Sequence, residues 1–213
     1  RSIAAGTSHG CAAMQASSGA GIYCWGLNTS GQLGAGNTTA IIGTTTVSQA
    51  VAGTALINSA TSYVAQIVAG TDFTCALRND GAVYCWGLNT SGQIGIGNTT
   101  SPQSTPVQVS GLSSGVVSLT AGAAHACALK NTGEVVCWGA NTNGQLGNGT
   151  TTNSTTPVPV DMSSVTTFTQ ISAGWSHTCA LDTSGIVYCW GQNLGQLGNG
   201  TTTRKDQPEV VTP

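Results

Sequence analysis

The sequence predicts an all-β protein made of four copies of one antiparallel unit. Three observations lead to this prediction. The chain repeats itself at a nearly fixed period, its apolar stretches are short and alternate with polar residues, and glycine, asparagine and aspartate separate these stretches. No stretch has the 3.6-residue period of an amphipathic helix, so helices are not expected.

Four tryptophans mark the repeat, because each directly follows a cysteine and directly precedes a glycine. They are separated by 61, 52 and 52 residues, so the first copy carries an extra loop. The tryptophans are Trp25, Trp86, Trp138 and Trp190. We expect a single repeat domain over 1–213, with copies at approximately 3–66, 67–118, 119–170 and 171–213.

Each copy reads as four short strands, which is the content of one antiparallel blade. The fourth copy shows the order: an Ile-Ser-Ala-Gly strand, a hairpin through the two cysteines, a Gly-Gln-Leu-Gly turn and a last strand that begins at Pro208. A single blade buries little surface and needs neighbours on both faces, as in propellers and stacked arrays.

The cysteines fit a hairpin register. If Cys179 lies opposite Cys189, then Leu181 faces Val187 and residues 183–185 form a three-residue loop ending in glycine, as such loops prefer. The second and third copies have the same spacing, and the first has a longer loop.

Three interpretations of the eight cysteines remain open. They are disulfides within blades, free buried thiols, or a zinc site, although no Cys-x-x-Cys motif is present. The favoured pairs are Cys11–Cys24, Cys75–Cys85, Cys127–Cys137 and Cys179–Cys189. Disulfides in every repeat imply an oxidising compartment, so we expect a secreted or cell-surface protein.

The charge content excludes several partners. Only five Lys and Arg and seven Asp and Glu occur in 213 residues, and no basic stripe exists to bind a phosphate backbone, so we expect no nucleic-acid partner. The apolar stretches are too short to span a bilayer, and no leader begins the chain, so we expect no membrane insertion and either a leader already removed or a cytosolic protein.

The repeated motif resembles a known family. Across the copies it reads Ala-Gly-x-x-His-Thr-Cys-Ala-Leu, then Gly-x-Val-Tyr-Cys-Trp-Gly-x-Asn-x-x-Gly-Gln-Leu-Gly-x-Gly-Thr, which is similar to the repeat of the regulator of chromosome condensation family over nearly all of the chain. The resemblance implies a β-propeller-type array of four four-stranded antiparallel blades with one disulfide per blade. Family members serve as interaction platforms, among them an exchange factor for a small GTPase, modules of ubiquitin ligases and a secreted bacterial inhibitor. The cysteine-containing version is similar to extracellular bacterial members.

Four copies are fewer than the family's usual number of about seven blades. Both ends of the chain are expected to fall within a blade and to offer an unpaired strand edge, which has to be covered. Three outcomes are possible: a four-bladed ring closed by its own ends, end-to-end association of subunits, or a piece of a longer propeller.

Candidate assembly contacts are apolar residues near these edges, in the long link from Ala40 to Gln66, and at one tryptophan that the other copies lack. They are Ile3, Pro208, Val210, Val211, Ile41, Ile42, Tyr63 and Trp175.

Three histidines stand two residues before the first cysteine of their copies, at His9, His125 and His177. They suggest either a metal ring or a packing position. Phe73 occupies the position in the second copy, which favours packing, so no metal or cofactor is expected.

Seven asparagines lie in Asn-x-Ser/Thr sequons, most of them within the turn motif, where they have a structural explanation as well as possible glycosylation. They are Asn28, Asn37, Asn89, Asn98, Asn148, Asn153 and Asn199.

We therefore predict a secreted, non-enzymatic protein that associates with itself end to end by strand completion, forming an extracellular fibre or a multi-chain propeller. The alternative is a monomeric or fragmentary extracellular propeller that binds a protein or a glycan, as an adhesin or an inhibitor does. No copy combines a nucleophile, a base and an orienting group, so we expect no catalytic site.

Overall fold

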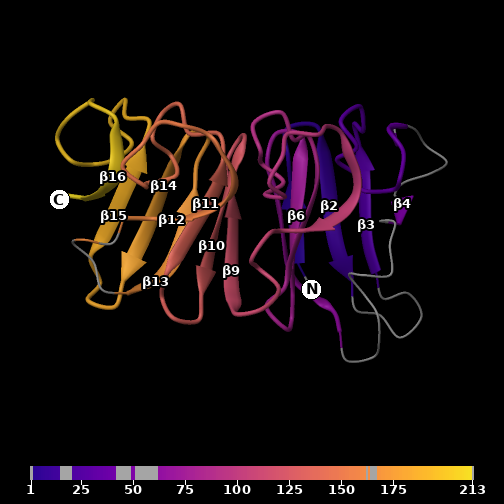
Figure 1. Cartoon of the computed structure of the whole chain (residues 1–213), viewed down its shortest axis with the longest axis horizontal. Coiled ribbons are helices and arrows are strands. Elements are labelled where there is room, and N and C mark those ends of the chain that lie inside the picture. The colour runs from indigo at the N-terminus through magenta and orange to yellow at the C-terminus, as the bar shows by residue number, and fades with distance from the viewer. Residues whose placement is uncertain are drawn as a thin grey trace.

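The computed structural model describes residues 2–14, 21–41, 49–50, 62–161, 163 and 167–212 (Figure 1). Within these residues all regular elements are strands, and none is a helix that could span a membrane. The strands are β1 (Ser2–Ala5), β2 (His9–Met14), β3 (Gly21–Gly26), β4 (Gln49–Ala50), β5 (Val64–Ala69), β6 (Phe73–Arg78), β7 (Val83–Gly87), β8 (Gln103–Gln108), β9 (Val116–Ala121), β10 (His125–Lys130), β11 (Val135–Gly139), β12 (Ser154–Pro159), β13 (Phe168–Ala173), β14 (His177–Asp182), β15 (Val187–Gly191) and β16 (Lys205–Val210).

Four consecutive strands form each sheet, and all pairings within a sheet are antiparallel. We call the sheets blade 1 (β1–β4), blade 2 (β5–β8), blade 3 (β9–β12) and blade 4 (β13–β16). The prediction of four four-stranded blades is confirmed, and blades 1 and 4 each contain four strands of their own. Neither blade therefore needs a strand from another subunit to complete it.

The blades follow one another in an open row. Strands β3 and β4 of blade 1 lie at one end of the molecule, and β15 and β16 of blade 4 lie at the other (Figure 1). The four-bladed ring closed by its own ends is thus not formed. The first strands of successive blades, β1, β5, β9 and β13, lie next to one another along the row.

The cysteine hairpins have the predicted register in all four blades. Cys179 lies opposite Cys189 and Leu181 opposite Val187, and the corresponding pairs of the other blades match. The predicted disulfides are present, with Cα atoms 4.1 Å apart in each pair. The turn ends at a glycine of positive φ, as at Gly185 (φ 83°), because a left-handed residue closes this three-residue loop.

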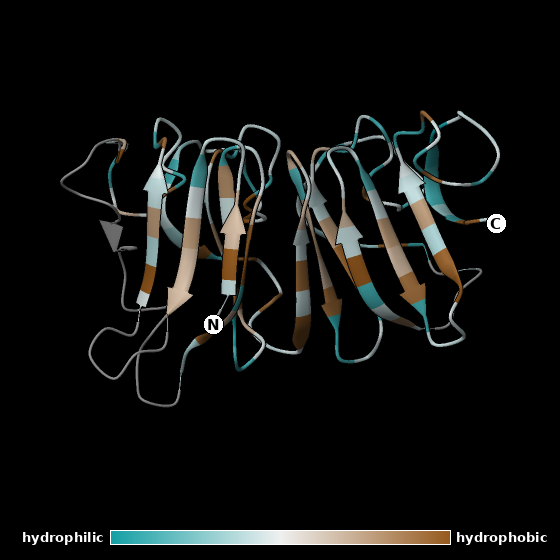
Figure 2. Cartoon of the chain, turned by 180° about the vertical axis from the view of Figure 1, so that it is seen from behind, coloured by the Kyte–Doolittle hydropathy of each residue, from teal (hydrophilic) through white to brown (hydrophobic). Residues whose placement is uncertain are grey.

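The core lies between the blades. Strand alternation sends the disulfide toward the next blade and the tryptophan toward the preceding blade. One cluster joins Cys75 and Cys85 of blade 2 to Ala126 and Trp138 of blade 3. Apolar bands accordingly cross the strands of all four blades (Figure 2). Each interface buries one face of each of two sheets, so a blade's stability depends on its neighbours.

Removal of one internal disulfide should destabilise the chain measurably. Closing a loop of about eleven residues stabilises by roughly 3 kcal/mol on the chain-entropy model. We expect the C127A/C137A double variant to lose about this much free energy of unfolding in urea denaturation. Reduction of the double variant with dithiothreitol should then cost less than reduction of the wild type. An unchanged urea midpoint in the double variant would contradict this role.

Candidate functional site

One tryptophan anchors each interface between blades. The indole Nε1–H of Trp86 donates to the backbone carbonyl of Gln32 in blade 1 at 2.9 Å. Trp138 donates in the same way to Gln93 at 2.9 Å, and Trp190 to Gln145 at 3.0 Å. All three tryptophans are fully buried. Each buried indole ring contributes a large apolar contact area, and its single N–H donor is hydrogen bonded. The hydrogen bond fixes the orientation of the ring in the interface.

The Gly-Gln-Leu-Gly turn is shaped to receive this tryptophan. The side-chain Oε1 of Gln145 accepts the N–H of Asn143 at 2.9 Å, which holds the turn while the backbone carbonyl of Gln145 faces the next blade. Gly147 must be glycine, because its φ is 68° and an added Cβ would lie 2.6 Å from the Nε1 of Trp190. The turn is thus a docking element for the neighbouring blade, and the prediction that it is a turn is confirmed.

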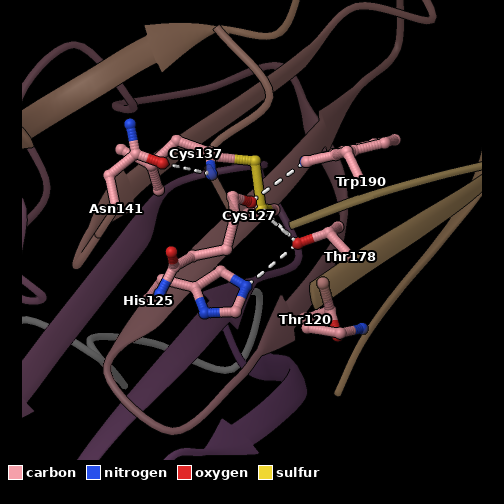
Figure 3. Close-up of a disulfide and its surroundings, with 10 residues drawn as sticks. Thr120, His125, Cys127, Cys137, Asn141, Thr178 and Trp190 are labelled. Carbon is pink, nitrogen blue, oxygen red and sulfur yellow. Dashed lines mark hydrogen bonds between the residues drawn. A yellow bond between two sulfur atoms is a disulfide. The ribbon is translucent and has the colours of Figure 1, made fainter. Parts of the chain in front are cut away.

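Two of the interfaces contain a buried histidine–threonine pair. His125 Nε2 lies 3.0 Å from Thr178 Oγ1, and Thr178 donates its hydroxyl hydrogen to the Gln145 carbonyl at 3.0 Å (Figure 3). Because that hydrogen is already used, Thr178 Oγ1 accepts from the imidazole, which is therefore the Nε2–H tautomer. His9 and Thr74 repeat the arrangement at 2.9 Å.

The interface between blades 2 and 3 replaces this polar pair by an apolar one. Phe73 stands where the other blades have histidine, and Ala126 stands where blades 2 and 4 have threonine. The ring occupies the same place, since an added Cβ at Gly70 would lie 2.0 Å from Phe73 Cε1, and at Gly122 2.2 Å from His125 Cε1. Both members of the pair change together, which leaves no buried hydroxyl or imidazole N–H without a partner.

The pairing predicts a strong coupling between residues 125 and 178. T178A alone should lower the free energy of unfolding by about 1–3 kcal/mol, because the buried His125 N–H loses its acceptor. The H125F/T178A double variant reproduces Phe73–Ala126 and should recover most of this loss. A double-mutant cycle from urea denaturation measures the coupling. Additive single effects would contradict the pairing.

Burial also shifts the titration of these histidines. Desolvation lowers the pKa of His125 from the ordinary value of 6.5 to about 3, with a smaller contribution from His177, and it lowers the pKa of His9 to about 4. The tautomer gives a structural reason for the same direction: a second proton would sit on Nδ1, which has no hydrogen-bond partner in either residue.

Stability should therefore fall with acid. Below pH 6.5 the unfolded histidines bind protons that folded His9 and His125 do not bind until about pH 4 and 3, so the free energy of unfolding decreases as pH falls through this window. The slope is up to about 1.4 kcal/mol per pH unit for each histidine. Urea midpoints between pH 7 and 4 should fall less steeply for H125F/T178A than for the wild type, and equal slopes would contradict the assignment.

A glutamine clamps the backbone of the next blade. Gln66 Oε1 accepts the N–H of Leu119 at 2.8 Å, and Gln66 Nε2 donates to the carbonyl of Leu119 at 2.9 Å. Gln170 holds the equivalent position in blade 4, where it is exposed. Since the clamp contacts only main-chain atoms, it fits any strand that presents its backbone at this place.

The outer face of blade 4, which we call the tail face, exposes side chains of a kind buried elsewhere. Val187 is 40% exposed, whereas the equivalent Val83 and Val135 are fully buried. Gln170, Leu181 and Val187 line a hollow of about 150 Å³ there. The tail face also carries His177 and the exposed Gln196, which are equivalent to His125 and Gln145.

The outer face of blade 1, which we call the head face, has the complementary parts. Ile3 is 76% exposed, whereas the equivalent Ile67 and Leu119 are 2% exposed. Ile3, Gly10 and Trp25 line a hollow of about 260 Å³. Trp25 corresponds to the tryptophans that anchor the internal interfaces.

A groove crosses the ends of β1, β5, β9 and β13, the first strands of the four blades. Its lining comes from the Ala-Gly-x segments of all four blades, and its volume is about 300 Å³. Backbone bonds join successive segments, from the N–H of Thr71 to Ala123 and from the N–H of Ala123 to Trp175. Trp175 is 66% exposed at the groove and is its one large aromatic side chain among the lining residues.

The predicted assembly contacts lie on several surfaces. Ile3 is on the head face and Trp175 in the groove. Pro208 and Val210 belong to the outer strand β16, and the N–H of Val211 donates to the carbonyl of Val187 at 2.9 Å. The structure therefore places the backbone of Val211 beside that of Val187, whereas the other predicted contacts named here do not lie together.

The contacts predicted in the long link are separate again. Ile41 exchanges backbone hydrogen bonds with Gly26 and packs against the core between blades 1 and 2. Tyr63 is 43% exposed beside Asn79, to which it is hydrogen bonded. Ile42 lies outside the described residues.

The sequon asparagines fall into two groups. Asn28 and Asn89 are fully buried, and each side-chain amide donates to carbonyls of its own loop, as from Asn89 to Asn98 at 3.0 Å. A glycan on their Nδ2 would displace these bonds, so burial argues against modification of the folded chain there. Asn199 is partly exposed, but its Nδ2 atom is buried. The sequons that remain partly or fully accessible are Asn37, Asn98, Asn148 and Asn153.

Sequence reasoning missed Thr74 and Thr178, which meet histidines of the preceding blades. It also gave no role to Gly10 and Gln170, which lie on the head face and the tail face. The exchange of His–Thr for Phe–Ala between copies was the signal that could have found the two threonines.

Four four-stranded blades joined through buried tryptophans define a propeller-type repeat protein. Models of the regulator of chromosome condensation (RCC1) repeat match residues 20–77, 80–129 and 132–181, and a second model of this repeat matches 64–93, 116–145 and 168–196. The chain belongs to the RCC1 repeat family.

Similar proteins agree with this placement. The chain is 34% identical to the ultraviolet-B receptor UVR8 of Arabidopsis thaliana, over 99% of this chain and 46% of the receptor, and 32% identical to the human E3 ubiquitin-protein ligase HERC2, over 99% of this chain and 4% of the ligase. Human WBSCR16 has the same fold (TM-score 0.80, 23% identity), as has Prp20p of Saccharomyces cerevisiae (TM-score 0.78, 21% identity). The alignments cover 99% of this chain and 51% and 50% of those proteins, so the chain spans about half the length of these propellers.

Proposed function

We propose that the chain is a secreted, non-enzymatic interaction module whose tail face packs against the head face of a second copy, giving a fibre or a multi-chain propeller. The observation that carries the proposal is the exposure of Val187 on the tail face, at a position that is fully buried in blades 2 and 3. Apolar area of this kind favours association when a complementary face is available.

The three internal interfaces serve as templates for this contact. In each of them a tryptophan of one blade binds the Gly-Gln turn of the blade before it. The tail face offers the turn at Gln196, with its side-chain oxygen bonded to the N–H of Leu194 as in the internal turns, and the head face offers Trp25. Such a heterologous contact generates rings or filaments by repetition.

Two further observations support the remaining parts of the proposal. A disulfide in every blade suits an oxidising compartment, which supports secretion. Acidic side chains hold turns, as where Asp182 accepts the N–H groups of Ser184 and Ile186 at 2.7 and 2.8 Å, and this structural use supports a non-enzymatic function.

The alternative is a monomer that binds a protein or a glycan in the groove. The observation that favours it is Trp175, since an exposed tryptophan beside a groove is a common anchor for a partner or a sugar ring. The two functions separate experimentally, because they use different surfaces.

A charge introduced on either end face should weaken association. Sedimentation velocity of the wild type over a range of concentrations should give a growing average mass, and V187K or I3K should weaken association at least tenfold because each buries an unpaired charge. V117K is the matched control, since Val117 is 54% exposed on β9, away from both end faces. W175A should leave association unchanged. A wild type that stays monomeric, with a ligand lost on W175A, would favour the alternative.

A further inference from the structure

The tail face carries a histidine, His177, in addition to its apolar side chains. His177 has the same local setting as His125: the N–H of Gly174 donates to the His177 carbonyl at 3.0 Å, and an added Cβ at Gly174 would lie 2.0 Å from the Cε1 of His177. The ring is therefore held in the position from which His125 reaches Thr178, and no partner has to order it.

The chain itself shows what each kind of ring accepts. His9 and His125 each face a threonine of the next blade. Phe73, which stands at the same position in blade 2, faces Ala126 of blade 3. The chemical reason is that a buried imidazole N–H needs an acceptor, which the threonine oxygen supplies, whereas a phenyl ring has no hydrogen to donate and packs against an apolar neighbour.

We propose that His177 makes the tail face selective for a blade that carries threonine at the position of Thr74 and Thr178. Gln170 adds a contact that does not depend on the partner's sequence, because the equivalent Gln66 binds only the backbone of Leu119. The selective partner is thus an RCC1-type blade with a hydroxyl on the second residue of its second strand. The inference rests on the proposed use of the tail face for docking a blade.

The head face of a second copy lacks the threonine that His177 requires as an acceptor. It presents Gly10 at the threonine position, so His177 would be buried without an acceptor. The space over Gly10 holds the ring of Trp25, whose Cζ2 would lie 2.7 Å from an added Cβ. Self-association through the end faces therefore lacks one hydrogen bond that the interfaces between blades 1 and 2 and between blades 3 and 4 possess.

The first test restores that hydrogen bond in the full chain. G10T should associate about fivefold to tenfold more tightly than G10V in sedimentation equilibrium, since threonine and valine have the same shape beside Trp25 and differ in a hydroxyl against a methyl group. H177F should remove the difference between them. Circular dichroism and urea denaturation establish that the variants are folded.

The second test changes only the tail face and keeps Gly10. H177F should associate about fivefold more tightly than the wild type, because the phenyl ring of the variant needs no acceptor and internal Phe73 already packs against a small residue. H177F remains informative if neither Gly10 variant folds.

The outcomes separate the two proposals. Association that is equal in G10T and G10V and unchanged by H177F would overturn the selectivity while leaving end-to-end association in place. Every variant remaining monomeric would overturn both. Absence of coupling between His125 and Thr178 inside the folded chain would overturn the selectivity independently of any association.

Discussion

The fold depends on the contact of one sheet face with the next. Each blade has two faces and no second layer of its own, so its apolar side chains are buried only when a neighbour covers them. The dependence is clearest at the three buried tryptophans. Each packs in an interface between blades and donates its only N–H to a backbone carbonyl of the preceding blade; they are Trp86, Trp138 and Trp190. The disulfides fix the hairpins, but the joints between blades hold the array together. Stability and binding consequently use the same surfaces.

Much of the architecture follows from local sequence. The period of the tryptophans, the glycine after each hairpin turn and the spacing of Cys179 and Cys189 predict the sheets, the register and the disulfides, because strand pairing between neighbours in sequence obeys simple geometry. The strand of the blade at which the chain begins was harder to predict. The first strand of the chain is already the first strand of a four-stranded blade, so blades 1 and 4 contain all four strands without a contribution from another subunit.

The polar pairs were beyond local reasoning, because their members are far apart in sequence. His9 and Thr74 are 65 residues apart, and His125 and Thr178 are 53 apart. Their meaning appears only when the second strand of one blade is known to face the second strand of the next. A packing role for the histidines was predicted from Phe73, and the structure confirms it for His9 and His125, which are buried. The histidine–threonine hydrogen bond is indicated only by a pair of replacements: the copy after Phe73 has Ala126 where blades 2 and 4 have Thr74 and Thr178.

The alternation of His–Thr and Phe–Ala joints has a consequence for how such an array can grow by gene duplication. A tandem copy of blade 4 would place Thr178 against His177 and would fit without adjustment. A tandem copy of blade 3 would set Ala126 against His125 and bury an imidazole N–H without an acceptor. A tandem copy of blade 2 would set the hydroxyl of Thr74 against the apolar ring of Phe73. Of these tandem duplications, that of blade 4 is thus the easiest, and that of blade 2 or blade 3 needs a compensating change on the facing strand.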